Sequence, residues 1–358
     1  MSRANNPWID LLMAQGVGDY RLISCVGTGG FGFVFGAEHT DSGARFAVKV
    51  LDPQVGTEHV VDFENEGVLL SLLTACDGVI NYVESGSDSV ELTANGINVS
   101  VPIRFHVLAL ASGSVNELVE DPGARADMAW PAKLRLWRDV VLGIQQMHLR
   151  GVAHRDLKAE NCLLLVRGQT TAVKIADFGR AKDLNTLPSR TLGSYVAGRG
   201  DLRFAPPEFL FLQGGSLARD FIAADHYGLG SILAELISGH PMSAVVLGDP
   251  GGVIRQAQHD RAAGYQRNLA GLAVPYRTAI SDMLTLTPAS IREDLSVLLS
   301  RLCHPVPEQR LEGSPYSRDR AARDPLSWVI RRTDIMIRRL ERDARSERRR
   351  NQKARIAA

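Results

Sequence analysis

A glycine-rich turn between two β-type runs most constrains how this chain can fold. The turn Gly27-Thr28-Gly29-Gly30-Phe31-Gly32 leads directly into Phe33-Val34-Phe35. A dinucleotide-binding motif of the same spacing needs its last glycine to open a helix between parallel strands. Here β-type sequence follows instead and resumes at Arg45-Phe46-Ala47-Val48-Lys49-Val50. Residues 19–50 therefore predict an antiparallel meander, and a βαβ unit is excluded.

The periodicity changes further along the chain. Apolar residues at helical spacing predict a helix over 60–73. We expect two β-like stretches at 79–83 and 103–110, separated by a polar insertion from 85 to 98. Helical patterns dominate after residue 112, at 133–149, 224–238 and 294–303. Strands followed by helices indicate an α+β protein with a boundary near Ala111.

Composition limits the classes of protein this chain can belong to. Its 358 residues are 45% hydrophobic, with 41 Lys and Arg against 40 Asp and Glu. The hydrophobic fraction excludes a wholly disordered chain, and the near-neutral charge balance argues against a surface that binds nucleic acid or membrane as a whole. The four cysteines lie far apart, so we expect reduced thiols. With no apparent leader or membrane span, we expect a cytoplasmic protein.

The last stretch of the chain is strongly basic. Residues 331–358 hold eleven Lys or Arg and four acids, a net charge of 11 − 4 = +7. A short seam alternates at helical spacing and comprises Leu326, Ile330, Thr333, Ile337, Leu340 and Ala344. The segment predicts a helical appendage that packs on its own domain, forms a dimer seam or contacts a weak anionic partner. We expect it to be separable from catalysis unless Trp328, Val329 and Ile330 pack into the helical region.

Several charged residues have spacings suited to phosphate chemistry. The glycine turn is either an ordinary hairpin or a surface that lays backbone N–H groups over phosphates. Lys49 lies among apolar strand residues and needs an acid if its ammonium is to face phosphate oxygens. Glu66 on the following helix can supply that acid. Glu64 is the alternative, but the apolar face of the helix favours Glu66.

The strongest pattern is His154-Arg155-Asp156-Leu157-Lys158-Ala159-Glu160-Asn161, followed by Asp177-Phe178-Gly179. Asn161 and Asp177 offer hard oxygen atoms of the kind that Mg²⁺ prefers. Asp156 can accept a proton from a hydroxyl group. Lys158 can neutralise a transferring phosphoryl group.

With these residues the sequence resembles the eukaryotic-type serine/threonine protein kinases, over roughly Tyr20 to Arg310. Pro206-Pro207-Glu208 is similar to the Ala-Pro-Glu that closes the activation segment. Asp225, with Gly230, is similar to the helix start whose aspartate braces the catalytic loop, and Arg310 to the arginine that pairs with Glu208.

The resemblance implies an α+β, bilobal, protein-kinase-like fold. A small antiparallel β-sheet lobe with one main helix would be followed by a larger, mostly helical lobe. We expect an N-terminal extension at 1–18, a nucleotide-binding N-lobe at 19–111, a C-lobe at 112–320 and a basic helical tail at 321–358.

The resemblance also implies ATP and Mg²⁺ as cofactors, with Mn²⁺ as the alternative metal. Lys49 would bind the α and β phosphates and pair with Glu66, and Asn161 and Asp177 would hold the metal. Asp156 and Lys158 would act on a protein Ser or Thr hydroxyl. The remaining nucleotide-binding set is Gly27, Thr28, Gly29, Gly30, Phe31, Gly32, Val34, Ala47, Leu108, Ala109 and Ala111.

Three positions depart from the family pattern. Asp201 stands where Thr is usual, Pro206 replaces Ala and Tyr227 replaces Trp. None removes a catalytic group. The alternatives to an active kinase are an inactive pseudokinase scaffold and a small-molecule phosphotransferase with a kinase-like fold; Arg155 and Glu208 argue against the second.

Regulation by self-phosphorylation is a further expectation. The segment from Asp177 to Glu208 offers Thr191 and Ser194, and Arg155 could pair with a phosphate there. The alternative is a segment that is already ordered, with Asp201 supplying a fixed carboxylate.

Overall fold

Alternating apolar residues form a five-stranded antiparallel sheet in the first third of the chain. The computed structural model describes residues 6–29, 31–94, 97–187, 193, 195, 200–311 and 324–357. The strands follow the order β1-β2-β3-β5-β4. Their bounds are β1 (Tyr20–Thr28), β2 (Gly32–His39), β3 (Arg45–Leu51), β4 (Tyr82–Ala94) and β5 (Ile97–Ala109). Phe35, Val48, Val50 and Val107 are fully buried in the core of this lobe.

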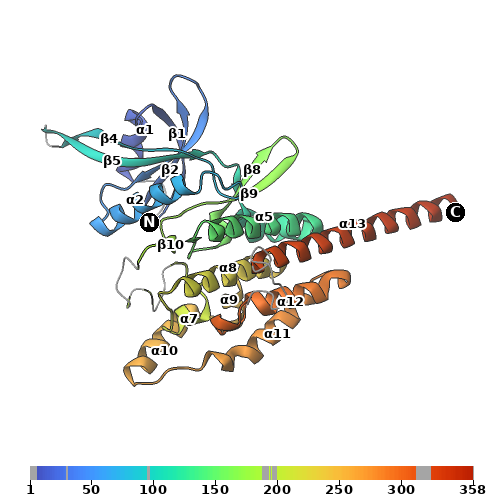
Figure 1. Cartoon of the computed structure of the whole chain (residues 1–358). Helices are drawn as coiled ribbons and strands as arrows, with labels where there is room; N and C mark the ends of the chain where they lie inside the picture. The colour runs from blue at the N-terminus through green and yellow to red at the C-terminus, as the bar shows by residue number, and fades with distance from the viewer. Residues whose placement is uncertain are drawn as a thin grey trace.

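Two helices pack on the sheet (Figure 1). Helix α1 (Pro7–Gln15) buries Trp8 and Leu12 against it, so the expected N-terminal extension contains a helix that belongs to the small lobe. Helix α2 (Thr57–Leu72) lies where the periodicity predicts a helix. It buries Phe63 and Leu70 and carries Glu66 toward the other lobe.

The expectation of a polar insertion at 85–98 is wrong. Strands β4 and β5 continue through this segment as one long hairpin, paired from Tyr82 opposite Leu108 to Ala94 opposite Ile97. The outer part is exposed on most positions, so its side chains show no buried face for a pattern to reveal. Backbone pairing across the hairpin satisfies the N–H and C=O groups without that face. Val79 and Ile80, expected in a strand, are instead buried before β4 begins, where Val79 bridges Ile175.

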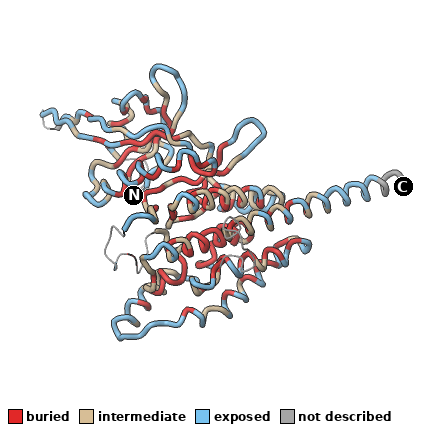
Figure 2. The backbone as a smooth tube through the Cα atoms, in the orientation of Figure 1, coloured by how far each residue is buried: buried red, intermediate tan, exposed pale blue. Residues whose placement is uncertain are grey.

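The second lobe is mostly helical. Its longest interior helices are α5 (Trp130–Leu149) and α8 (Ala218–Ser238), and Trp137 donates an indole hydrogen bond to the Leu229 carbonyl between them at 2.9 Å. Figure 2 shows that buried residues are concentrated in these helices and in the small-lobe sheet. The other helices are α3 (Val115–Glu120), α4 (Pro122–Asp127), α7 (Pro207–Leu210), α9 (Met242–Leu247), α10 (Pro250–Ala262), α11 (Ala273–Leu284) and α12 (Arg292–Leu302).

Short strands between α5 and α8 hold the loops that carry the chemistry. Strand β7 (Val152–Ala153) pairs with β10 (Lys182–Asp183). Strands β6 (Gly113–Ser114), β8 (Cys162–Arg167) and β9 (Thr170–Ile175) form a second small sheet in the order β6-β8-β9. The one-turn 3₁₀ helix η1 (Ala159–Asn161) joins the first loop to β8.

The basic tail is helix α13 (Pro325–Ala357), and its first half packs on the large lobe. Leu326, Val329 and Met336 are buried, and Asp334 accepts a hydrogen bond from Arg138 on α5 at 2.6 Å. Trp328 and Ile330 also pack against the core. The far end extends away from the lobe (Figure 1), and residues 344–352 are exposed. Within the described ranges, no helix is long and apolar enough to span a membrane.

Candidate active site

Lys49 joins the two lobes through ion pairs. Strand alternation places it between the buried Val48 and Val50 with its side chain on the opposite face of β3. Its Nζ lies 2.7 Å from Glu66 Oε2 on α2 and 3.0 Å from Asp177 Oδ1. Burial alone would lower the pKa of Lys49, but the two carboxylates raise it above its ordinary value. The ammonium is therefore charged and fixed.

Glu66, and not Glu64, faces Lys49. The Glu66 side chain is buried, whereas Glu64 points outward and pairs with Arg104 on β5 at 3.1 Å. The helix register that the apolar face of α2 favours is the one observed.

Asp225, a buried residue of α8, holds the loop that carries Asp156. Its carboxylate accepts the backbone N–H groups of His154 at 2.8 Å and Arg155 at 2.7 Å. Arg155 has a φ of 67°, a conformation that needs such bracing. Asn161 closes the loop by donating from Nδ2 to the Asp156 carbonyl at 2.8 Å.

Asp177 is held in place by its buried neighbour. Phe178 is fully buried in the large-lobe core, and Asp177 itself has a φ of 64°. Lys49 lowers the pKa of Asp177 to about 2, against the opposing effect of burial. Its side chain remains 40% exposed, so a carboxylate faces the space between the lobes.

Asn161 and Asp177 fit a divalent metal. The Nδ2 of Asn161 is used by the loop, which leaves Oδ1 as a ligand atom, and Asp177 uses Oδ1 for Lys49. Amide and carboxylate oxygens that accompany substrate phosphates suit a hard cation.

The Asp156 carboxylate is surrounded by cations that it does not closely bind. Burial raises its pKa, while Lys158 and Arg180 act in the opposite direction. Arg180 Nε lies 3.5 Å from Asp156 Oδ2, and Lys158 pairs instead with Glu160 at 2.9 Å. Gly200 lies close to the same carboxylate: an added Cβ there would lie 2.5 Å from Asp156 Oδ1.

The expected nucleotide-covering residues lie at the junction of the lobes. Ala47 and Leu108 are paired across β3 and β5 and belong to the core that continues into the large lobe. Val34, Ala109 and Ala111 pack against the same core.

The glycine turn joins β1 to β2, with Thr28 paired to Phe33. Gly32 approaches β3 so closely that a Cβ would lie 2.0 Å from the Val50 carbonyl oxygen. The Phe31 ring contacts His59, with centroids 5.0 Å apart. Gly27 and Gly29 are described, and Gly30 lies outside the described residues.

Arg310 and Glu208 form the ion pair that the family resemblance implies. The pair is buried and bidentate, with distances of 2.6 and 2.7 Å.

A cavity of about 170 Å³ adjoins Asp156 and is lined mainly by apolar residues, among them Leu202 and Pro206.

The Arg155 guanidinium packs on aromatic rings. Its guanidinium lies over the rings of Tyr195 and Phe221, at 5.1 and 4.6 Å. The expected phosphate acceptors Thr191 and Ser194 lie outside the described residues. Sequence reasoning also missed Arg180 and Gly200, since only the folded chain brings them to Asp156.

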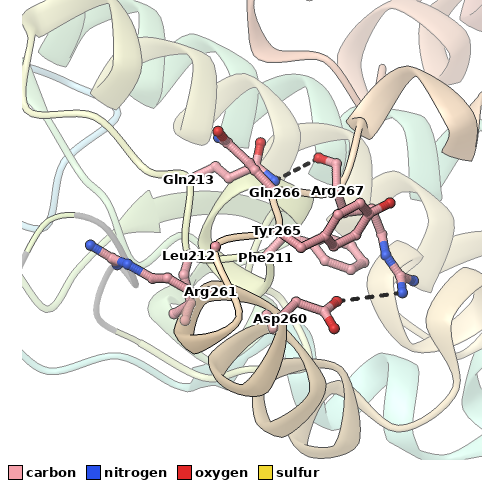
Figure 3. Close-up of a pocket in the computed structure, with 10 residues that line it drawn as sticks. Phe211, Leu212, Gln213, Asp260, Arg261, Tyr265, Gln266 and Arg267 are labelled. Carbon is pink, nitrogen blue, oxygen red and sulfur yellow. Dashed lines mark hydrogen bonds and ion pairs between the residues drawn. The ribbon is translucent and has the colours of Figure 1, made fainter.

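A second depression is unrelated to this chemistry. It has a volume of about 310 Å³, lies between the end of α7 and the loop after α10, and shares no lining residue with the Asp156 cavity (Figure 3). Arg267 pairs with Asp260 at 3.7 Å, and its carbonyl accepts from Gln213 at 2.8 Å.

The two-lobed arrangement and the charged residues between the lobes can be compared with known proteins. Residues 20–318 match the protein kinase domain family. The chain belongs to this family. It is 28% identical over 230 residues to the serine/threonine-protein kinase ATG1a of Arabidopsis thaliana, covering 64% of this chain and 33% of that protein.

Two other relatives show similar identity. The serine/threonine-protein kinase Pkn1 of Myxococcus xanthus is 28% identical over 235 residues, which cover 64% of this chain and 30% of Pkn1. The inhibitor of nuclear factor kappa-B kinase subunit alpha of Gallus gallus is 28% identical over 232 residues, which cover 63% of this chain and 28% of that protein. The match thus spans about a third of the relatives' own lengths.

Proposed function

We propose that this protein kinase domain is an active serine/threonine kinase that transfers the ATP γ-phosphoryl group to protein hydroxyls. The observation that carries the proposal is Lys49, which contacts Glu66 and Asp177 at once. A fixed ammonium between the lobes can bind nucleotide phosphates only when these three groups are assembled. Relatives named as serine/threonine-protein kinases support the choice of hydroxyl.

Each residue then has a separate task. Lys49 positions the α and β phosphates, and Asp156 orients the acceptor hydroxyl and takes its proton. The raised pKa of Asp156 makes it a better base than an exposed aspartate. Lys158, close to both Asp156 and Glu160, offsets charge on the moving phosphoryl group.

Asn161 and Asp177 would hold the divalent metal, for which we propose Mg²⁺, with Mn²⁺ as the alternative. When bound, the metal neutralises charge on the β and γ phosphates.

We also propose a cytoplasmic location. The cysteines Cys25, Cys76, Cys162 and Cys303 are all free thiols, as a reducing compartment favours.

We further propose self-phosphorylation at Thr191 or Ser194. Mass spectrometry after incubation with Mg·ATP tests the modification, and an unmodified protein would rule it out.

The decisive experiment for the function measures phosphate transfer from labelled ATP to a generic basic protein, followed by phosphoamino-acid analysis. We expect labelled Ser or Thr from the wild type and a loss of about 10³-fold or more in Asp156→Asn, because the base is lost while the fold is kept. Equal labelling by the two proteins, or none by the wild type, would contradict the proposal.

A further inference from the structure

The outer part of α13 carries a row of exposed arginines on one face of the helix. Spacings of four, three and four residues keep them within an arc of about 60° around a helix of about 3.6 residues per turn. The row is called the basic stripe below and comprises Arg338, Arg342, Arg345 and Arg349. It begins beside the buried Ile337 and Leu340 and continues onto the end of α13 that extends away from the lobe (Figure 1).

The basic stripe does not hold α13 on the large lobe. Other side chains make that contact, such as Arg339, which pairs with Asp294 on α12 at 2.8 Å. Arg342 has its exposed neighbour Asp343 at 3.8 Å. Among the described residues, no Asp or Glu oxygen lies within 4.0 Å of a side-chain nitrogen of the other three arginines of the stripe. The stripe is therefore a line of largely uncompensated positive charge.

This arrangement of charge costs helix stability. Like charges three or four residues apart lie next to each other on a helix and repel, and every step of the stripe is such a pair. Residues 344–352 hold four arginines and one acid, Glu347. Glu347 lies two residues before Arg349 and about 160° around the helix from it, so it faces away from the stripe. A partner that supplies negative charge along this face would remove the repulsion, and nothing in the proposed phosphate transfer uses the stripe.

The dimensions of the stripe fit duplex DNA. From Arg338 to Arg349 the helix rises by about 17 Å. The major groove of B-form DNA is about 12 Å wide and admits an α-helix, and phosphates line both of its walls. The exposed Arg348 and Arg350 lie about 100° to either side of Arg349, so guanidinium groups can face both walls. The planar guanidinium matches phosphate oxygens with two hydrogen bonds at once.

The composition of the same segment argues against a membrane surface as the partner. A helix that lies in a bilayer interface needs a face of Trp, Phe or Leu beside its basic residues. Residues 344–352 contain none of these types, and their one apolar residue is Ala344. Leu340, the nearest large apolar side chain before this segment, is buried on the lobe.

We propose that the outer part of α13 binds double-stranded DNA, with the basic stripe on the phosphates that line the major groove. The sequence outside 331–358 carries a net negative charge, which DNA repels, so the contact is confined to the protruding helix. This inference goes beyond the proposed kinase function and does not depend on it, because none of the residues assigned to phosphate transfer lies on α13.

The test measures binding of the full chain to a fluorescein-labelled DNA duplex by fluorescence anisotropy, without ATP. The duplex has about 20 base pairs, which give about two turns of the major groove. Kd is measured at NaCl concentrations between about 0.05 and 0.2 M. Each neutralised phosphate contributes about −0.9 to the slope of the logarithm of the association constant against the logarithm of the NaCl concentration. We therefore expect a wild-type slope of about −3 or steeper.

Two matched double variants locate the contact. Arg345→Gln with Arg349→Gln removes half of the stripe, and Gln forms helices about as well as Arg. We expect the slope to become shallower by about 2 and Kd at about 0.1 M NaCl to rise by about tenfold or more. Arg261→Gln with Arg277→Gln removes the same charge at exposed positions on α10 and α11, and should keep the wild-type slope and Kd.

Absence of binding by the wild type at about 0.05 M NaCl would overturn the inference, and so would an equal loss of binding in the two double variants. Two further probes are duplex RNA of the same sequence, whose major groove is too narrow to enter, and vesicles of equal parts phosphatidylserine and phosphatidylcholine. Binding of either probe as tight as that of the DNA duplex would also overturn it. Labelling of the generic basic protein judges the kinase function separately, and Arg345→Gln with Arg349→Gln should leave that labelling unchanged.

Discussion

At the scale of single residues, Lys49 makes the connection on which the proposed chemistry depends. Lys49→Met removes an ammonium that two carboxylates hold in place. We expect kcat/KM for ATP-dependent phosphorylation to fall by about 10² to 10⁴, the scale of losing a preorganised charge. Arg45→Met, at the exposed start of the same strand, is the control and should keep its activity. A Lys49→Met activity within about twofold of the wild type would assign the phosphates to another cation.

Gly200 offers a test of how closely the activation segment is fitted to Asp156. It has a φ of 135°, and a Cβ would lie 2.5 Å from Asp156 Oδ1. Gly200→Ala should lower kcat by about tenfold or more, because a displaced base loses its alignment with the hydroxyl. Gly264→Ala is the matched control, since its φ is 75° but its Cβ would meet open space. If the two variants had the same kcat, backbone strain alone would explain the effect.

Glu235 also makes a prediction about stability. Its pKa is about 8 in the folded chain, against an ordinary value of 4.5, because burial and the nearby acids Glu160, Glu120 and Asp201 favour the neutral carboxyl group, against the opposing effect of Arg203. Between these two pH values the folded chain keeps a proton that the unfolded chain has released. The free energy of unfolding therefore falls as the pH rises through this range.

Glu235→Gln removes that loss. We expect its Tm to exceed that of the wild type by a few degrees at about pH 9, and the difference to shrink toward about pH 5. Thermal unfolding followed by circular dichroism measures this, with Glu293→Gln, at an exposed acid on α12, as the control. A Tm difference that is the same at both pH values would show that Glu235 does not titrate as described.

At the scale of elements, α13 is both a structural helix and a protruding one. Its first half buries Leu326, Val329 and Met336, and Asp294 on α12 pairs with Arg332 and Arg339 at 2.9 and 2.8 Å. Residues 344–352 of the same helix are exposed. We expected the tail to be separable from catalysis unless the segment around Trp328 packs into the helical lobe. That segment does pack there, so we expect the folded large lobe to need the first half of α13.

Two truncations should separate the halves of α13. A chain ending at Arg320 exposes the core beneath the helix, so we expect insoluble protein or a Tm lower by about 10 °C or more. A chain ending at Ala344 loses a segment whose described side chains, at 345–352, are all exposed, so it should keep its Tm and its peptide phosphorylation. Equal melting of the two truncated proteins would contradict the packing of the first half.

The segments of the candidate active site are ones that residue spacing in the sequence predicts well. The turn after β1, the loop from His154 to Asn161 and the Asp177 turn are each short and local, so residue type and spacing predict them directly. The Glu66 register also follows from one apolar helix face. In contrast, the long β4–β5 hairpin has almost no buried face over its outer half, and the alternation rule gives no signal there.

At the scale of the whole molecule, two lobes supply different parts of one site. The small lobe provides Lys49 and Glu66, and the large lobe provides Asp156, Asn161 and Asp177. Lys49 spans the junction by pairing with one acid from each lobe. A site divided in this way depends on how the lobes meet, which no single segment encodes.

The sequence by itself determined the α+β arrangement, the family and the residues of the proposed phosphate chemistry, because these depend on local periodicity and on motifs of fixed spacing. The tertiary structure alone decided that the Arg155 guanidinium lies over the rings of Tyr195 and Phe221, that Gly200 lies close to Asp156 and that Glu235 is buried with its Oε2 lacking a hydrogen-bond partner among the described residues. Each of these features joins segments far apart in the chain. Burial, ion pairing and close contact arise only when packing brings such segments together, so their energies have no signature in local sequence.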